Sequence, residues 1–522
     1  MIKKLYVAIV LALAMTVSAC SSGSGSASTD VEGPSDSTGA NGEQSSDSLT
    51  VAMAFAPDAG LAIDTDDALT LADSGTVEGL VKSNADGEPK PALAESWTQV
   101  DETTWEFKLR GDVTFHDGTS FEADAVVTAF EYLANSATPP RTVKGIGLAA
   151  EAVDAQTVRV TTENADPILP IRLSSANTAI LSPAAYETET ADPIGHGTGP
   201  FEIVAFEPDQ SLTVKRYEDY WGEKAKLSEA TLRFLPDASS RAAAIRSGEV
   251  DIAEGIALAD LEAIEQDDAI RLETFSLPRT TSLYTNTSSG PMSNPSVREA
   301  VNLTVDKTSI AEQLLEGEFI PATSYFGPEN AWLPGNDVPN DPDQAKKVLE
   351  EAGFSTDGSD PGLAITLWTY PDRPELEDIA VVVQAQLEEV GFSVELTVGE
   401  YSVLEPQVLE GGHDLFVLSR SYYLDVADPG AFLDSDFTCE GGYNLNAYCS
   451  DEFDALMTDL AETTDLSERE ALFASAATLL SEETVGIPIA HNQAQVAVSE
   501  QVEGYVQDPF ERTLLTPELS LG

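Results

Sequence analysis

"LAITLWTY" (363–370) is an apolar run with the length of one strand, and the sequence that follows it decides the fold. Two more runs of this kind follow, "SVELTV" (393–398) and "HDLFVLS" (413–419). A helical pattern from Glu375 to Val390 separates the first two runs. The segment "YSVLEPQVLEGG", which we also interpret as a helix, separates the last two. Strands that alternate with helices predict a parallel sheet wound by helices.

Two loops of this segment carry the candidate binding residues. Open parallel sheets bind ligands beyond the carboxyl ends of their strands. The loops "PDRPE" and "SYYLDVADPG" follow the first and the third strand and leave the sheet at that edge. We therefore expect Arg373 and Asp425 at this edge, with Tyr422 and Tyr423 nearby.

Capping residues mark helix ends elsewhere in the chain. In "ATLRFLPDASSRAAAIRSGEVDIAEG", interpreted as strand, helix and strand, Ser239 or Ser240 can cap the helix and Gly248 can end it. Asn294 and Asp341 each precede a proline, which is favoured at the first helical position. These two residues predict the starts of two further helices.

The N-terminus indicates export. Lys3 and Lys4 precede an apolar run of thirteen residues from Leu5 to Val17, which is shorter than the ~20 residues that a spanning helix needs. Small residues follow, as in a secretory signal. The ending "VSAC" resembles a bacterial lipobox, in which signal peptidase II cuts before the cysteine, here Cys20, and the sulfur carries a diacylglycerol. A plain secretion signal with an incidental cysteine is the alternative.

The segment after Cys20 has the composition of a linker. Residues 21–48 are rich in Ser, Gly, Ala, Thr and Asp, with one Val and no aromatic residue. Such a stretch cannot bury a core, so it predicts a flexible tether. We expect a signal peptide over 1–19, and a lipidated cysteine with its tether over 20–48. The rest of the chain is long enough for two or three domains.

The other two cysteines, Cys439 and Cys449, are an even pair in an exported protein. Oxidising surroundings favour a disulfide between them. A zinc site fits less well because it needs more ligands near C-x-x-C spacing, and a catalytic thiol is expected to be a lone cysteine. The predicted bridge closes a short loop, so it rigidifies that loop more than it stabilises the fold.

The chain is strongly acidic, with 27 basic and 90 acidic residues and a net charge of −63. Residues 1–19 hold two lysines and no acidic residue, so the chain from Cys20 onward carries −65. Phosphates would be repelled, which excludes nucleic acid as a partner. Cation capture is one interpretation of this acidity. A salt-adapted or solubilising surface is favoured, because the acidic residues are spread along the whole chain.

Catalytic and metal-binding motifs are absent from the sequence. It has no H-E-x-x-H, no Walker loop and no nucleophile elbow, and "DTDDALTLAD" lacks the glycine and final glutamate of a calcium loop. Its histidines, His116, His196, His413 and His491, are scattered without metal spacing. We therefore expect no enzyme, no cofactor and no metal site.

One long stretch, "PALAESWTQVDETTWEFKLRGDVTFHDGTSFEADAVVTAFEYL", resembles the signature region of family 5 extracellular solute-binding proteins. The segments "SSRAAAIRSGEVDIAEG", "PMSNPSVREAVNLTVDKTSI" and "YNLNAYCSDEFDALM" continue the resemblance in the same order, from about Pro91 to Met457. This family serves ABC importers of dipeptides, oligopeptides and nickel. The resemblance implies an α/β, two-lobed periplasmic-binding-protein-like fold (type II, cluster C). An extra subdomain enlarges the first lobe, and a hinge lets the lobes close around the ligand.

The resemblance also implies the organisation and surroundings of the protein. Its domains would be lobe I over 49–88, 197–278 and 487–522, the extra subdomain over 89–196, and lobe II over 279–486. The protein would be a monomer, lipid-anchored to the outer face of the cytoplasmic membrane or held in the periplasm. Its partners would be the ligand and the ABC permease and ATPase complex.

For a peptide ligand, the resemblance assigns roles to the loop residues. In peptide-binding members an aspartate in the segment matching "SYYLDVADPG" holds the α-ammonium group, which implies Asp425, with Asp428 as second choice. Arg373 fits the place of an arginine that takes the C-terminal carboxylate in dipeptide binders. A zwitterion buried between lobes needs each charge paired, and arginine offers a bidentate fork. Tyr422 and Tyr423 would wall the cleft.

A metal complex is the alternative ligand. The segments "TVEGLVKSNADGEPKPALAESW" and "ELTVGEYSVL" are more similar to the nickel and metallophore branch, and Tyr422 and Tyr423 stand where peptide binders often carry tryptophan. That branch typically binds a chelated metal through arginine, aromatic residues or histidine, a role that Arg420 and His413 can fill. The sequence thus predicts capture of a small peptide, with a nickel or metal-chelate complex as the alternative.

Overall fold

The structure is a computed structural model that describes residues 47–84, 87–333, 340–371, 373–423 and 425–522. The expected signal peptide, Cys20 and nearly all of the tether lie outside these residues. In the described ranges, no helix is both long and apolar enough to cross a membrane. The described residues belong to one compact unit.

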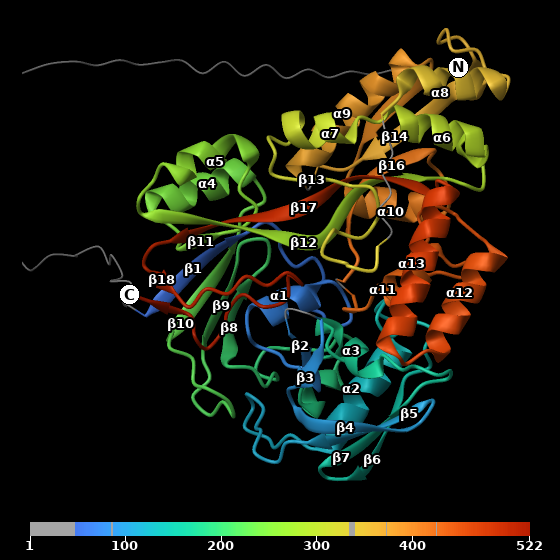
Figure 1. Cartoon of the computed structure of the whole chain (residues 1–522). Helices are drawn as coiled ribbons and strands as arrows, with labels where there is room; N and C mark the ends of the chain where they lie inside the picture. The colour runs from blue at the N-terminus through green and yellow to red at the C-terminus, as the bar shows by residue number, and fades with distance from the viewer. Residues whose placement is uncertain (1–46, 85–86, 334–339, 372, 424) are drawn as a thin grey trace, which may run out of the picture. The chain divides into compact units, whose positions relative to one another are not determined.

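A large mixed sheet forms the centre of this unit (Figure 1). Its strand order is β15-β14-β16-β12-β17-β11-β1-β10-β9-β8, and β13 pairs with β17 beside this path. The strands are β1 (Ser48–Met53), β8 (Phe201–Glu207), β9 (Ser211–Arg216), β10 (Glu229–Phe234), β11 (Ile252–Ala253), β12 (Ile270–Thr285), β13 (Ile320–Pro321), β14 (Ala364–Thr369), β15 (Ser393–Val398), β16 (Leu415–Ser421) and β17 (Gly486–Ser499).

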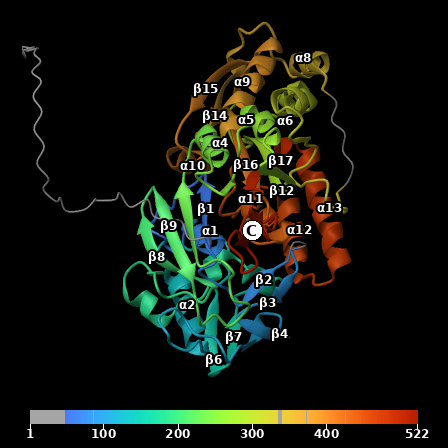
Figure 2. The same ribbon diagram turned by 90° about the vertical axis from the view of Figure 1, so that its left-hand side faces the viewer.

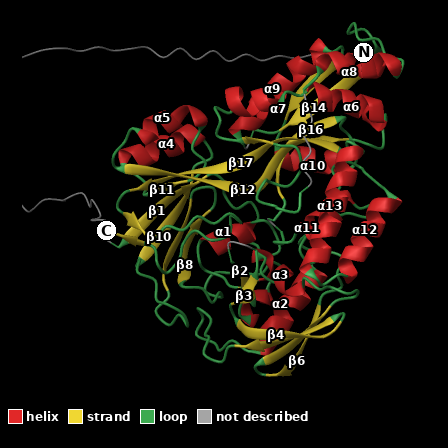
Figure 3. Cartoon of the chain, in the orientation of Figure 1, coloured by secondary structure: helices red, strands yellow, loops and turns green. Residues whose placement is uncertain are grey.

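Two long antiparallel strands, β12 and β17, join the two halves of this sheet (Figure 3). One end of the pair adjoins β16, and the other adjoins β11. Their pairing shifts in register between Ser276 and Thr280, around Pro278. Such a shift bends a strand and increases its twist. The bend lies between the half of the sheet with β14–β16 and the half with β1 and β8–β11.

A smaller antiparallel sheet packs its own core (Figures 1 and 2). Its order is β4-β5-β7-β6, and α2 packs against it, burying Phe130 and Leu133 beside Phe107 and Val158. The fully buried members of this core all come from residues 80–180. The strands of this sheet and of two short pairs are β4 (Ala94–Asp101), β5 (Thr104–Leu109), β6 (Ala149–Asp154) and β7 (Thr157–Thr161), then β2 (Val81–Ser83) with β3 (Pro89–Pro91) and β18 (Val502–Glu503) with β19 (Ser520–Leu521).

Helices pack against both sheets (Figure 3). In the half of the large sheet that holds β14–β16, α9 packs on all three of these strands. The α-helices are α1 (Asp67–Asp73), α2 (Ala123–Asn135), α3 (Leu169–Arg172), α4 (Ala238–Ser247), α5 (Leu258–Glu265), α6 (Pro295–Thr304), α7 (Lys307–Ser309), α8 (Pro342–Glu351), α9 (Pro374–Glu389), α10 (Tyr401–Leu409), α11 (Pro429–Phe437), α12 (Asp451–Glu462) and α13 (Leu466–Glu482).

The α/β segment that the sequence predicts is confirmed. β14, α9, β15, α10 and β16 follow one another as expected, and β14 pairs in parallel with both β15 and β16. Beyond β16 the pairing with β12 and β17 is antiparallel, so the predicted parallel sheet is one part of a mixed sheet. The two predicted caps before prolines are also confirmed, since Asn294 and Asp341 accept backbone N–H bonds at the starts of α6 and α8.

The predicted cap of α4 is wrong. Asp237 is the N-cap, and its carboxylate accepts a hydrogen bond from the backbone N–H of Ser240 at 2.7 Å. Ser239 and Ser240 lie inside the first turn instead, because aspartate is as good a cap as serine and comes earlier. Gly248 ends the helix as predicted, in the left-handed conformation with φ 71°.

Two glycines, one after α8 and one after α9, provide a test of the packing around the α/β segment. Gly391 has φ 110°, and a Cβ there would lie 2.6 Å from the Thr356 backbone, whereas Gly353 has φ 93° and open space. We expect Gly391→Ala to lower the free energy of unfolding by about 2–5 kcal/mol and Gly353→Ala by about 1 kcal/mol. Urea unfolding of both variants checks this, and equal losses would contradict the clash.

Candidate functional site

Asp425 follows β16 and lies between two guanidinium groups. Its Oδ1 accepts a hydrogen bond from Arg141 Nε at 2.9 Å, and its Oδ2 accepts one from Arg420 Nη2 at 3.0 Å. Burial raises the pKa of the Asp425 carboxyl, but the positive charges of Arg141 and Arg420 outweigh this effect and hold it well below its usual range. Asp425 is therefore ionised at neutral pH. Each of its oxygens keeps a further acceptor position, because a carboxylate has about four.

A second carboxylate holds Arg420 in place. Arg420 Nε and Nη2 donate hydrogen bonds to the two carboxylate oxygens of Asp436, at 3.0 and 3.1 Å. Asp436 lies in α11 and is fully buried. The ring of Tyr443 covers the cluster, with its centre 4.6 Å from the Arg420 guanidinium carbon and 5.6 Å from that of Arg141. Since a lone buried guanidinium would be costly, Asp436 fixes Arg420, which in turn positions Asp425.

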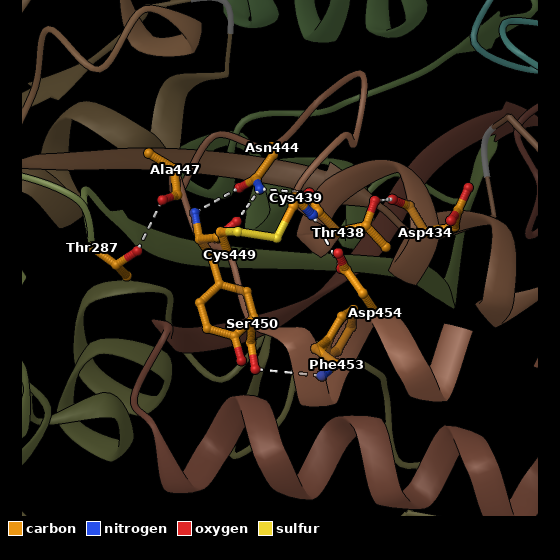
Figure 4. The surroundings of a disulfide bond; sticks show 11 residues. Thr287, Asp434, Thr438, Cys439, Asn444, Ala447, Cys449, Ser450, Phe453 and Asp454 are labelled. Carbon is orange, nitrogen blue, oxygen red and sulfur yellow. Dashed lines mark hydrogen bonds between the residues drawn. A yellow bond between two sulfur atoms is a disulfide. The ribbon is translucent and has the colours of Figure 1, made fainter. Parts of the chain in front are cut away.

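The loop that carries Tyr443 is closed by a disulfide. The sulfur atoms of Cys439 and Cys449 are bonded in the structure (Figure 4). Inside the closed loop, Asn444 Nδ2 donates to the carbonyl oxygen of Thr438 at 2.9 Å. The bridge and this bond together hold the loop that places Tyr443 over the arginines.

The two tyrosines of the β16 loop lie in different surroundings. Tyr422 is 2% exposed, and its hydroxyl accepts a bond from the backbone N–H of Gly327 at 3.0 Å and donates to Glu329. Tyr423 lies against the C-terminal segment, with its ring centre 5.8 Å from that of Phe510. Tyr422 is therefore a buried wall residue, and Tyr423 joins the loop to the end of the chain.

Arg373 lies at the expected edge of the sheet but outside the ion cluster of Asp425. It is the N-cap residue of α9, in the short loop after β14. Its guanidinium carbon lies 5.7 Å from the ring centre of Phe55, a residue 52% exposed in the loop after β1. Arg373 and Asp425 thus follow neighbouring parallel strands, each with partners of its own.

Two further candidate residues have structural surroundings. Asp428 caps α11 through the N–H of Gly430, and both its oxygens accept bonds from Arg469 at 2.8 and 2.9 Å. His413 precedes β16 and is buried, which lowers its pKa to about 4. It lies about 23 Å along the strand from Arg420, at ~3.3 Å per residue. The structure therefore does not bring His413 and Arg420 to one site.

A small cavity opens beside Asp425. It offers about 20 Å³ to the centre of a water molecule, enough for one or two waters. Anything larger needs the surrounding elements to move apart. The polar residues that line it are Arg141, Arg172, Arg420, Ser421, Tyr422, Asp425 and Ser435.

Sequence reasoning missed three charged residues of this site, Arg141, Arg172 and Asp436. Arg141 precedes Asp425 by 284 positions, and Arg172 is likewise distant. The prolines before Arg141 mark a loop but reveal nothing of its partner. Pairings of this kind arise when the small sheet packs beside the β16 loop, so they leave no local pattern.

The sequence profile of bacterial extracellular solute-binding proteins, family 5 (middle region), matches residues 88–444, more than half of the chain. The chain belongs to this family. Its members are extracellular solute-binding proteins rather than enzymes. Family membership therefore supports an extracytoplasmic protein that binds a solute.

Relatives of known structure or assignment agree with this. The chain is 28% identical to a probable di/tripeptide-binding protein of Pseudomonas aeruginosa over 463 residues, 82% of this chain and 86% of the relative. It is 26% identical to the nickel-binding protein NikA of Staphylococcus aureus over 437 residues, 83% and 87% of the two chains. The peptide-bound structure of DppA from Helicobacter pylori superposes with a TM-score of 0.79 at 25% identity, covering 91% of this chain and 98% of that one. The two-lobed α/β fold that the resemblance implies is confirmed.

The charge of Asp425 should be visible in the pH dependence of stability. We expect Asp425→Asn to lower the free energy of unfolding by about 1–3 kcal/mol at pH 7, since two guanidinium groups each lose one of their two carboxylate partners. Because the pKa of Asp425 is lower in the folded protein, its charge stabilises the fold in full above the unfolded-state pKa of ~4. This contribution declines as the pH falls below ~4 and is lost once the pH has passed through the folded-state pKa. The difference between the proteins should therefore shrink at pH 3, measured by urea unfolding.

Asp66→Asn is the matched control for this variant. Asp66 also accepts a bond from Arg141, at 2.9 Å, but its side chain is 72% exposed. Its loss should cost no more than about 0.5 kcal/mol. Equal effects of the two substitutions, or a pH-independent loss for Asp425→Asn, would refute the role given to the ion cluster.

Proposed function

We propose that this protein is the substrate-binding lipoprotein of an ABC importer and captures a small peptide between its two lobes. The observation that carries the proposal is the ionised Asp425, which borders a cavity next to tyrosine and arginine side chains. An anion held in this way is suited to an α-ammonium group, the one charge that all free peptides share at the N-terminus.

The existing bonds of Asp425 leave room for an ammonium group. Each carboxylate oxygen accepts one guanidinium N–H and can accept one more donor. Arg141 and Arg420 keep the carboxylate charged. Arg420 shares its single positive charge between Asp425 and Asp436. The Asp425 carboxylate is thus already oriented before the ligand arrives, which reduces the free-energy cost of binding.

Arg373 is proposed to receive the other end of the ligand. It follows β14, the parallel neighbour of the strand that Asp425 follows. Its guanidinium already lies beside an exposed phenylalanine, Phe55. A carboxylate at Arg373 and an ammonium at Asp425 would pair both charges of a zwitterion, as burial requires.

Binding is proposed to require motion of the lobes. We place lobe I at 49–88, 197–278 and 487–522, its extra subdomain at 89–196, and lobe II at 279–486. A space of one or two waters is too small for a peptide. The first connection between lobes falls in β12 where its register shifts, between Ser276 and Thr280. A bent strand at this point suits a hinge.

A metal-chelate complex is the second candidate ligand. Three arginines, Arg141, Arg172 and Arg420, line the cavity beside Asp425. The carboxylates of a chelator would find guanidinium donors there, which is the geometry arginine favours. If the ligand is a metal-chelate complex, its binding should not depend on the negative charge of Asp425.

A thermal-shift screen distinguishes the two ligands. The purified protein is heated with di- to pentapeptides, with nickel, and with nickel–histidine, for wild type and Asp425→Asn. A ligand at a hundredfold its dissociation constant adds about 2.7 kcal/mol of stability. We expect peptides to raise the melting temperature of wild type, and Asp425→Asn to abolish that shift.

Asp428→Asn serves as the structural control for the screen. It removes a buried carboxylate of the same loop that pairs with Arg469, so it should lower the melting temperature without abolishing the peptide shift. If nickel–histidine alone stabilises the protein, and does so equally in Asp425→Asn, the metal candidate replaces the peptide.

Membrane attachment is proposed to depend on Cys20. The residue is preceded by an apolar run and "VSA", as in lipidated bacterial proteins. We expect the full-length protein to fractionate with membranes and Cys20→Ser to be found in the soluble fraction. Cys439→Ser is the control and should stay with the membranes. Soluble wild-type protein would refute the anchor while leaving the ligand proposal intact.

A further inference from the structure

A second cavity lies between the end of α6, the end of α13 and the start of β17. It offers about 20 Å³ to the centre of a water molecule. It shares no lining residue with the cavity beside Asp425. The rings of Phe326 and Phe432, one from each cavity, pack edge-on with centres 5.6 Å apart and separate them. The lining includes Asn302, Lys307, Ser324, Phe326, Leu480 and Pro488.

Lys307 is the charged residue of this cavity. It begins α7 and is 8% exposed. In the part of the chain that the structure describes, its ammonium group forms neither a hydrogen bond nor an ion pair. The neighbouring Asp306 uses its carboxylate to cap α7, accepting the N–H of Ser309 at 2.9 Å. His491 lies near enough for the charge of Lys307 to act on it, and burial lowers its pKa to about 4, so it is neutral.

The position of Lys307 differs from that of every other buried basic residue in the described ranges. The side chains of these residues donate to carbonyl or carboxylate oxygens, and the residues are Arg241, Arg279, Arg298, Arg420, Arg469 and Arg512. A buried cation without a partner is costly. Burial lowers the pKa of Lys307 to about 8. At pH 7 the ammonium form of Lys307 therefore still predominates.

The polar groups around Lys307 suit an anion. Asn302 Oδ1 is buried and has no hydrogen-bond partner in the described part of the chain. Asn302 also lines the cavity, and a half-turn of its amide places the NH₂ group where Oδ1 now lies. The hydroxyl of Ser324 lines the cavity as well. Together these groups supply one charge and up to two neutral donors.

We propose that this cavity binds a small monovalent anion, of the size of chloride or formate, through the ammonium group of Lys307. The volume limits the ligand to a few atoms. The charge of the site calls for an anion even though the protein as a whole is acidic. This cavity shares no lining residue with the cavity beside Asp425. The anion proposal is therefore independent of the proposed transport ligand.

The test compares anions at constant ionic strength, which holds general screening of this acidic protein fixed. The purified full chain is kept in sodium gluconate at pH 7, and gluconate is replaced stepwise by chloride, bromide or formate. We expect each small anion to raise the melting temperature, with saturation, because gluconate is too large for the cavity. Identical melting curves in all four salts would overturn the proposal.

Lys307→Met and Lys347→Met make a matched pair of variants. Lys347 is an exposed lysine of α8. We expect Lys307→Met to weaken anion binding by about 30-fold or more, and Lys347→Met to bind as wild type does. An unchanged anion response in Lys307→Met would refute the site.

Crystals soaked in bromide provide a readout that needs no variant. We expect an anomalous peak within hydrogen-bonding distance of Lys307 Nζ, and replacement by formate should remove it if both anions share the site. Absence of the peak would overturn the proposal even if salts change the melting temperature. This measurement also decides the question if Lys307→Met does not fold.

Discussion

The bidentate bond between Arg420 and the buried Asp436 is the interaction on which the candidate site depends. It holds a guanidinium group at the carboxyl end of β16, where that group reaches Asp425. Asp425 then meets Arg141 from the segment of the small sheet. A chain of alternating charges therefore runs from a core helix, α11, to the loop between α2 and β6, and each member is balanced by the next. This alternation allows charged groups to stay buried at moderate cost.

The long strands β12 and β17 connect the two halves of the large sheet and so govern how the site of Asp425 can move. They are shared by both halves of the large sheet, and their pairing is irregular around Pro278. A continuous hydrogen-bonded sheet keeps the halves together, while the irregular register allows them to bend. Arg141 and Arg420, which both bind Asp425, belong to segments far apart in the chain. Bending of the sheet that moves one segment against the other would therefore change the site itself.

The few basic residues of this acidic protein occupy particular positions. The chain carries 90 acidic residues against 27 basic ones, yet several of the basic side chains are buried, where each arginine finds an oxygen acceptor. The scarce basic residues serve at positions where the backbone or a carboxylate needs a donor. Lys307 is the exception among the described residues, and its surroundings favour an exogenous anion.

Local sequence determined much of the fold and part of the site. Period and capping signals predicted the strands and helices from β14 to β16, and the order of these elements placed Arg373 and Asp425 after neighbouring parallel strands, because that depends on chain direction alone. The cap of α4 was misassigned since Asp237 and the serines after it are nearly equivalent as caps. The tertiary structure decided which groups meet Asp425, that Asp428 pairs with Arg469, and that Lys307 lines a cavity. Such contacts join residues far apart in the chain, and only the packing of separate elements brings them together.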